Sequence, residues 1–317
     1  MKLDNINKKN IIFFSQGIHS FGGKHILKFL LNQFQNNNII LLSDNRLKLK
    51  VKTKKIIKLN NDFFSIFSNL NFIKKINADY LFFINGLPPI FKTKINHYVF
   101  FQNANILDFK FKFSWIFSKN ILRYIYFRLF KKNTVNWIVF NPYTKNLLRK
   151  YLNIESKIQV MNFKFETKFF NKRKRKLLYD LFYPASGDPH KNHIILIKSL
   201  IILSKKNIFP TLLITLDEYS KAKINLDYYI NYYNLRIYNK LFDSETSIYN
   251  AYLSSRSLIF PSLNETLAIP LYEASFFKLR ILMSNRLKIF KSKYKNIMYF
   301  DPTSANSISR VILKSIK

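Results

Sequence analysis

Cysteine, acidic side chains and long apolar runs are missing or scarce in this sequence of 317 residues. No cysteine occurs, so a disulfide framework, a thiolate metal site and a cysteine nucleophile are all excluded. A chain without cysteine fits the reducing cytoplasm, and we expect a cytoplasmic protein.

The apolar runs are too short for a membrane span. The longest, residues 194–203, is broken by Lys198 and Ser199 and falls short of the roughly 18 apolar residues that a spanning helix needs. Residues 1–10 are polar and contain lysine, unlike a secretory signal. We therefore expect a protein that is not secreted and is either soluble or bound at a membrane surface.

Acidic residues are greatly outnumbered, with 17 Asp and Glu against 53 Lys and Arg, a formal net charge of +36. Such an excess suggests a polyanionic partner, and nucleic acid, an anionic membrane and phosphorylated substrates all qualify. Drift in base composition is the alternative origin, because Lys, Asn, Ile, Phe and Tyr are the residues that A/T-rich codons supply. In either case the surface attracts acidic lipid head groups, by up to about 1 kcal/mol per well-placed cation. We expect peripheral attachment to the inner face of the cell membrane.

Short apolar runs alternate with helical patterns in the first half of the chain, which predicts a parallel sheet with helices between the strands. The predicted strands are residues 10–14, 39–42, 80–84, 98–101 and 137–140. The predicted helices are residues 24–34, 121–130 and 143–151, and residues 15–23 are predicted as a loop.

The alternation lapses at residues 163–176, a charged stretch that we interpret as a linker between domains at 1–165 and 177–317. The basic cluster 172–176 within it has a rival interpretation as a nucleic-acid-binding arm. Beyond the linker the pattern predicts a second parallel α/β domain. Its predicted strands are residues 177–183, 211–216, 235–241, 257–260 and 280–283, and its helices are 191–204, 246–254, 270–277 and one from about 304.

The segment FPSLNETLAIPLYEA, residues 260–274, carries two glutamates at a predicted strand end. Glu265 lies in the loop after the strand, and Glu273 is predicted in the first turn of a helix that begins near Pro270. Ligands of open parallel sheets bind at such strand ends. Two carboxylates there can accept hydrogen bonds from two hydroxyl-bearing parts of an extended ligand, and the helix N-terminus suits a phosphate. Taken singly, Glu273 could instead complement the helix dipole and Glu265 be an ordinary loop carboxylate.

A second segment, LFYPASGDPHKNHIILIKSL at residues 181–200, has a strand that breaks at Pro184 and a helix that opens near Asn192. Lys191 is therefore predicted at a helix start. A cation there, together with free helix N–H groups, can neutralise a diphosphate leaving group.

The two segments resemble the signature of the GT-B retaining glycosyltransferases, the large family often called glycosyltransferase family 4. In that family a strand and Pro-Ser lead into Glu, seven residues and Glu-Ala, and a lysine stands on the phosphates. The resemblance implies that Glu265 contacts the donor sugar, Glu273 holds the ribose, and Lys191 holds the diphosphate. Glu265 and Lys191 are then the candidate catalytic residues. Three neighbours would complete the nucleotide-sugar site: His190, Thr266 and Leu267. His190 either bonds a phosphate or shapes the turn.

Loops in the first half look like the acceptor side of the same family. Gly22 and Gly23 precede the first predicted helix, where a glycine pair lets backbone approach a bound group closely, although packing explains many such loops. The segments FINGLPP and YVFFQNANIL resemble cleft-lining strand ends, with Gln102 and Asn103 where many relatives carry histidine. The four residues are predicted to contact the acceptor or a phosphate.

The sequence departs from the family pattern at several positions. Ser186 replaces the common arginine five positions before the lysine, and Ala268 replaces a glycine. Lys278 and Arg280 stand where Gly and Pro are usual, a change that bears on the turn more than on the chemistry. The departures support an alternative, a catalytically inactive relative that acts as a scaffold.

The resemblance implies a GT-B fold, two Rossmann-like parallel α/β domains that face a cleft. It implies transfer of a hexose, with retention, from a UDP- or GDP-sugar to a hydroxyl of a glycan or lipid-linked glycan in surface polysaccharide biosynthesis. No Asp-x-Asp motif occurs, so we expect no cofactor and no metal. A basic nucleic-acid-binding protein is the remaining rival, but no nucleic-acid motif is present and we expect no specific nucleic-acid partner.

Overall fold

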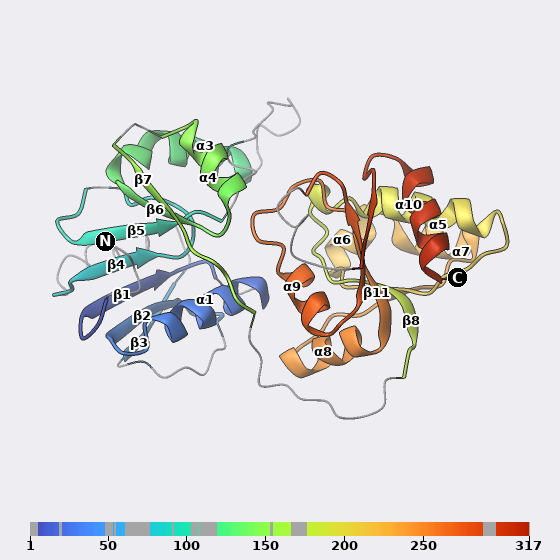
Figure 1. Cartoon of the computed structure of the whole chain (residues 1–317), viewed down its shortest axis with the longest axis horizontal. Coiled ribbons are helices and arrows are strands. Elements are labelled where there is room, and N and C mark those ends of the chain that lie inside the picture. Colours follow the sequence, from blue (N-terminus) through green and yellow to red (C-terminus); the bar gives the residue numbers. More distant parts are fainter. Residues whose placement is uncertain are drawn as a thin grey trace. The chain divides into compact units, whose positions relative to one another are not determined.

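A computed structural model describes residues 6–18, 21–47, 53, 55–60, 77–90, 92–102, 107, 119–152, 155–165, 176–287 and 296–316. The chain divides into two compact units, Met1–Lys164 and Phe165–Lys317. Each unit is built around one parallel sheet with helices on its faces (Figure 1). Within the described ranges, no helix is both long and apolar enough to cross a membrane.

The first unit contains a seven-stranded sheet in the order β3-β2-β1-β4-β5-β6-β7. Its strands are β1 (Asn10–Ser15), β2 (Asn38–Asp44), β3 (Lys55–Leu59), β4 (Tyr80–Phe83), β5 (Asn96–Phe100), β6 (Asn136–Val139) and β7 (Lys157–Val160). Its helices are α1 (Phe21–Gln33), α3 (Lys119–Phe130) and α4 (Pro142–Arg149), with a 3-10 turn at Lys131–Asn133.

Both faces of this sheet are apolar, as expected for strands covered by helices on either side. Phe13 and Phe82 stack on one face with ring centroids 5.2 Å apart, and Phe34 packs against both of them. On the other face Trp137 meets Phe127 of α3 at 5.8 Å. Because successive strand side chains point to opposite faces, the central strands are apolar without interruption.

The second unit contains a six-stranded sheet in the order β10-β9-β8-β11-β12-β13. Its strands are β8 (Tyr179–Tyr183), β9 (Leu212–Ile214), β10 (Ile237–Asn239), β11 (Ser255–Phe260), β12 (Arg280–Ser284) and β13 (Ile297–Phe300). Its helices are α5 (His193–Ser204), α6 (Glu218–Lys223), α7 (Leu226–Tyr233), α8 (Glu245–Leu253), α9 (Ile269–Phe276) and α10 (Ala305–Ile316), with a 3-10 turn at Pro189–Lys191.

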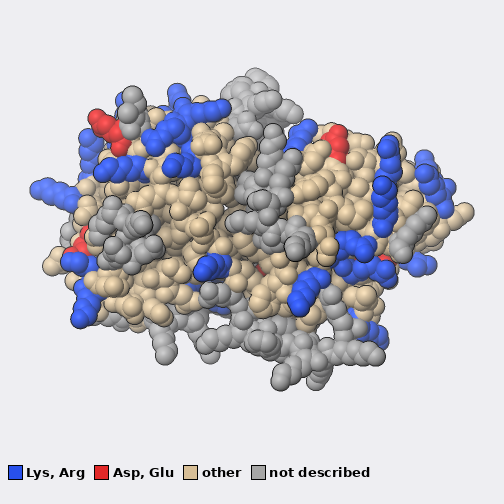
Figure 2. Space-filling view, in the orientation of Figure 1, with Lys and Arg blue, Asp and Glu red and all other residues tan. Residues whose placement is uncertain are grey.

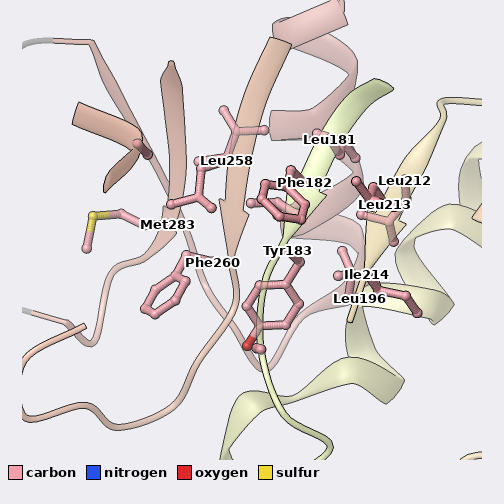
Figure 3. Close-up of a cluster of buried hydrophobic side chains, with 14 of the residues drawn as sticks. Leu181, Phe182, Tyr183, Leu196, Leu212, Leu213, Ile214, Leu258, Phe260 and Met283 are labelled. Atoms are coloured by element: carbon pink, nitrogen blue, oxygen red, sulfur yellow. The ribbon is translucent and has the colours of Figure 1, made fainter. Parts of the chain in front are cut away.

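The core of the second unit is centred on β8 and its neighbours (Figure 3). Phe182 packs edge-on against Tyr252 of α8, with centroids 4.9 Å apart. The next residue, Tyr183, points to the other face, where it contacts Phe260 and the ring of His193 in α5. The end of β8 is therefore held by buried contacts on both faces.

The predicted α/β class and the parallel sheets are confirmed. Three strands were not predicted, β3, β7 and β13; each lies at an edge of its sheet and exposes much of its length, so its apolar pattern is weak. Helices α6 and α7 were not predicted either. Of the predicted linker, residues 163–165 and 176 are irregular, and the rest lie outside the described residues. The arrangement of the two domains around a cleft stays a prediction.

Candidate functional site

The strand order of the second sheet creates a switch point between β8 and β11. The chain leaves β8 for β9 and β10 on one side and leaves β11 for β12 and β13 on the other. The loops at residues 184–192 and 261–268 therefore follow two adjacent strands at the same edge of the sheet. Open parallel sheets bind their ligands at such a point.

An ion pair joins these two loops. Lys191 Nζ lies 2.5 Å from Glu265 Oε1, although the residues are 74 positions apart in the sequence. The two side chains are only 18% and 10% exposed, so water screens their attraction incompletely. Lys191 and Glu265 were predicted as the catalytic pair, and the structure brings them into direct contact.

Tyr183 contacts both loops that carry the ion pair. Its buried hydroxyl donates to the carbonyl oxygen of Lys191 at 2.7 Å and lies 3.0 Å from the hydroxyl oxygen of Ser262. Burial raises the pKa of Tyr183 well above its usual value, so the phenol keeps its proton. A backbone hydrogen bond from Leu263 to the carbonyl of His190, 2.8 Å long, adds a second link between the loops.

Asn192 connects the site to the start of α5. Its backbone is left-handed, with φ of 65°, and its amide donates to the carbonyls of Pro261 at 3.2 Å and Pro302 at 2.7 Å. The predicted helix start near Asn192 is confirmed, because Asn192 is the N-cap of α5, but Lys191 itself lies just before the helix and not within it. Lys191 closes a 3-10 turn, and α5 begins two residues later, because the left-handed Asn192 interrupts the helical backbone.

His190 in this loop and His193, the first residue of α5, both have a lowered pKa. Burial lowers the pKa of His193 to about 4, so its neutral ring donates from Nε2 to the carbonyl of Ser186 at 2.9 Å. Burial, and then the charge of Lys191, lower the pKa of His190, which therefore offers a hydrogen bond and no charge at neutral pH. The Ser186 hydroxyl donates to Asp188 at 2.7 Å, so this position supplies no cation.

Glu273 lies in a different setting from the one predicted. Helix α9 begins at Ile269, which places Glu273 in the second turn, and only 4% of the residue is exposed. Tyr252 donates a hydrogen bond to its Oε2 at 2.6 Å. Burial raises the pKa of Glu273 to about 7, against the opposing effect of this bond. A buried carboxyl in a second turn does not complement the helix dipole, so that interpretation of Glu273 is excluded.

The loop that carries Glu265 leads directly into α9. Thr266 is half-buried and Leu267 is buried. Ala268, the residue in place of the family glycine, has φ of 52°, the left-handed conformation that glycine favours. The change of residue has therefore kept a glycine-type backbone at the start of α9.

The first unit contains the four other predicted residues. Gly22 and Gly23 do not precede the first helix but are its second and third residues. Gln102 follows β5, and its side-chain amide donates to the carbonyl of Ile84 at 2.9 Å, which ties together the segments after β4 and β5. Asn103 lies outside the described residues.

Four residues of the site were not predicted as such: Tyr183, Asn192, Tyr252 and Ser262. The signal for Tyr183 was a hydroxyl-bearing aromatic at the end of an apolar strand, where a buried phenol needs a partner. Among the described residues no three His, Asp or Glu side chains gather to hold a metal ion, and metal-independent binding stays a prediction.

No family model and no curated protein matches the sequence. Solved structures do match over nearly the whole chain. Sucrose-phosphate synthase from Thermosynechococcus elongatus gives a TM-score of 0.73 at 12% identity, covering 98% of this chain and 90% of that one. Anabaena HepE in complex with UDP and glucose gives 0.68 at 11%, with the same coverage. WaaG, a glycosyltransferase involved in lipopolysaccharide biosynthesis, gives 0.67 at 12%, covering 97% and 90%.

The chain thus has the GT-B glycosyltransferase fold, and the predicted fold is confirmed. Identities this low establish the fold alone, because unrelated functions share such folds.

Proposed function

We propose that this protein is a retaining glycosyltransferase that moves a hexose from a UDP- or GDP-sugar to a hydroxyl of a glycan or lipid-linked glycan in surface polysaccharide biosynthesis. The observation that carries the proposal is the ion pair between Lys191 and Glu265 at the switch point between β8 and β11. The complex of HepE with UDP and glucose supports a sugar nucleotide as the ligand of this fold.

Each charged group has a task that matches its position. When the bond from the anomeric carbon to the donor phosphate breaks, the diphosphate departs with the bonding electrons. Lys191 and the first N–H groups of α5 would neutralise that charge, so no metal is needed. Glu265 would contact the sugar, which becomes positively charged as the bond breaks. Glu273 would accept from the ribose hydroxyls; its carboxyl is already desolvated, which strengthens such a bond.

The proposed setting is the cytoplasm, with reversible attachment to the inner face of the cell membrane. A net charge of +36 favours an anionic bilayer, and a lipid-linked acceptor would be presented there.

Separate substitution of the two glutamates tests the proposal. Above about pH 8, where a carboxyl with a pKa of about 7 is ionised, Glu273→Gln should weaken UDP or GDP binding about ten- to a hundredfold, because a neutral acceptor replaces a charged one. Glu265→Gln should leave nucleotide binding nearly intact and lower turnover, because its contact is with the transferred sugar. Calorimetric titration and a transfer assay measure the two effects, and Glu218→Gln, on an exposed side chain, is the matched control. If both variants behave as the wild type does, the site assignment is wrong.

An inactive scaffold is the second candidate, favoured by Ser186, whose hydroxyl is bound to Asp188 where an arginine is usual. A thermal-shift screen of UDP- and GDP-sugars combined with a transfer assay separates the two. A ligand at 100 times its dissociation constant stabilises by about 2.7 kcal/mol, whether or not transfer follows. Binding without transfer in the wild type, with transfer restored in Ser186→Arg, would identify the missing cation as the cause.

A further inference from the structure

Helix α3 in the first unit exposes a stripe of three aliphatic side chains. Leu122, Ile125 and Leu129 are 68%, 48% and 66% exposed. Their spacing of three and four residues places them in one stripe along the helix. On the opposite side Phe127 is fully buried, with its ring 5.8 Å from those of Phe101 and Trp137. Because Phe127 anchors the opposite side of α3 in the core, the aliphatic stripe faces solvent.

Cations border the aliphatic stripe. On the helical wheel, exposed Arg123 and Arg128 lie to either side of it. From residue 109 to residue 154 the sequence holds ten Lys and Arg and no Asp or Glu, a stretch that includes α3 and α4. Figure 2 shows Lys and Arg gathered over the part of the first unit where these helices lie.

We infer that the solvent face of α3 is the surface by which this protein docks on an anionic lipid bilayer. The inference deepens the membrane attachment proposed above and rests on it. An amphipathic helix in the plane of an interface buries its apolar stripe at the level of the acyl chains, while flanking cations reach the head groups.

The arginines and aliphatic side chains of α3 argue against two other partners, a second copy of the chain and a nucleic acid. A second copy packed symmetrically on this face would bring the two sets of arginines together, and residues 109–154 contribute no acidic side chain to offset them. A nucleic acid would satisfy the cations but leave the three aliphatic side chains in water, because phosphates give them nothing to pack against. An anionic bilayer satisfies both the cations and the aliphatic stripe.

Vesicle flotation with the full chain tests the inference, using phosphatidylcholine alone and phosphatidylcholine with phosphatidylglycerol. The variant Leu122→Ser/Leu129→Ser keeps every charge and should lower partitioning into the mixed vesicles by about tenfold or more. Arg123→Gln/Arg128→Gln should lower it by about fivefold per arginine at low salt and by much less at high salt. The matched control Leu178→Ser/Leu241→Ser removes two exposed leucines of the second unit and should bind as the wild type does.

The outcomes separate this inference from the proposed enzyme function. Equal binding by the α3 variants and the wild type would overturn α3 as the docking surface. No binding of the wild type to mixed vesicles would overturn the membrane attachment as well. A wild-type dimer without lipid that the leucine variant abolishes would make the face a contact between copies. Thermal unfolding of the full chain followed by circular dichroism, which reports both units and needs no nucleotide, should be the same in all these variants and show that each is folded.

Discussion

At the scale of single residues, the candidate site depends on one buried hydroxyl. Tyr183 Oη donates to the Lys191 carbonyl and lies beside the hydroxyl of Ser262, so it links the loop of the cation to the loop of the carboxylate. Without it, two buried polar groups would lose a partner while the aromatic packing remained.

Tyr183→Phe should therefore lower the free energy of unfolding by roughly 1–3 kcal/mol, the cost of leaving buried polar groups unsatisfied. Turnover should fall as well, because the position of Lys191 relaxes. Urea unfolding and the transfer assay measure the two quantities. Tyr179→Phe, at the start of the same strand and away from the loops, is the control and should be close to neutral. Equal stability of both variants would mean that the hydroxyl does not hold the loops.

Glu273 should make stability depend on pH. Its pKa is about 7 in the folded chain against 4.5 for an ordinary glutamate carboxyl, so the native state binds the extra proton. The stabilising contribution is fully present below about pH 4.5 and is lost as the pH rises through about 7, by roughly 3 kcal/mol. The difference in unfolding free energy between wild type and Glu273→Gln, followed by urea unfolding across this range, should change by that amount. The same comparison for Glu218→Gln should stay flat.

At the scale of elements, the loop between β8 and α5 is shaped by its contact with α6. A Cβ added at Gly187 would lie 2.2 Å from both the Cβ and Oγ of Ser220, closer than any atoms can approach. The glycine thus allows α6 to sit directly against the loop that carries Lys191.

Gly187→Ala should cost about 1–3 kcal/mol of stability by overpacking, and should weaken nucleotide binding because the loop must move. Ser220→Gly alone should cost up to about 1 kcal/mol, as a glycine within a helix does. The double variant should recover most of the loss, because both clashing atoms are gone. A double-mutant cycle on unfolding free energies measures this coupling. Simple addition of the two single effects would contradict the close contact.

At the scale of the whole molecule, the excess of 53 Lys and Arg over 17 Asp and Glu bears on the nucleic-acid interpretation. Four aromatic residues of the second unit, Phe182, Tyr183, Tyr252 and Phe260, are buried in its core and cannot stack on bases, although others such as Tyr219 and Tyr232 are exposed. The basic cluster 172–176 lies outside the described residues apart from Lys176.

Binding to RNA or DNA should accordingly be weak, indifferent to sequence and steeply dependent on salt. Fluorescence anisotropy with two oligonucleotides of scrambled sequence should give equal affinities that fall at least about tenfold between about 50 and 200 mM salt. Selective binding of one oligonucleotide at physiological salt would instead favour the nucleic-acid-binding protein over the enzyme.

The sequence by itself determined the fold class, because the signals involved are local. Continuous apolar runs such as NIIFFS of β1, alternating with helical patterns, require a parallel sheet covered on both faces. The two strand-end segments also identified Lys191, Glu265 and Glu273 as candidates, since each motif lies within one short stretch of chain.

Only the tertiary structure decided how these residues meet. Lys191 and Glu265 are 74 positions apart, and Tyr252 and Glu273 are 21 apart; the sheet order that brings each pair together is not encoded near either residue. Local propensity also misplaced Gly22 and Gly23, which favour a loop yet lie in α1, because packing of its apolar face outweighs the cost of glycine. The residue types of a site can be recognised from short stretches of sequence. The burial of a side chain, its pKa and its hydrogen-bond or ion-pair partners depend on residues that only folding brings close.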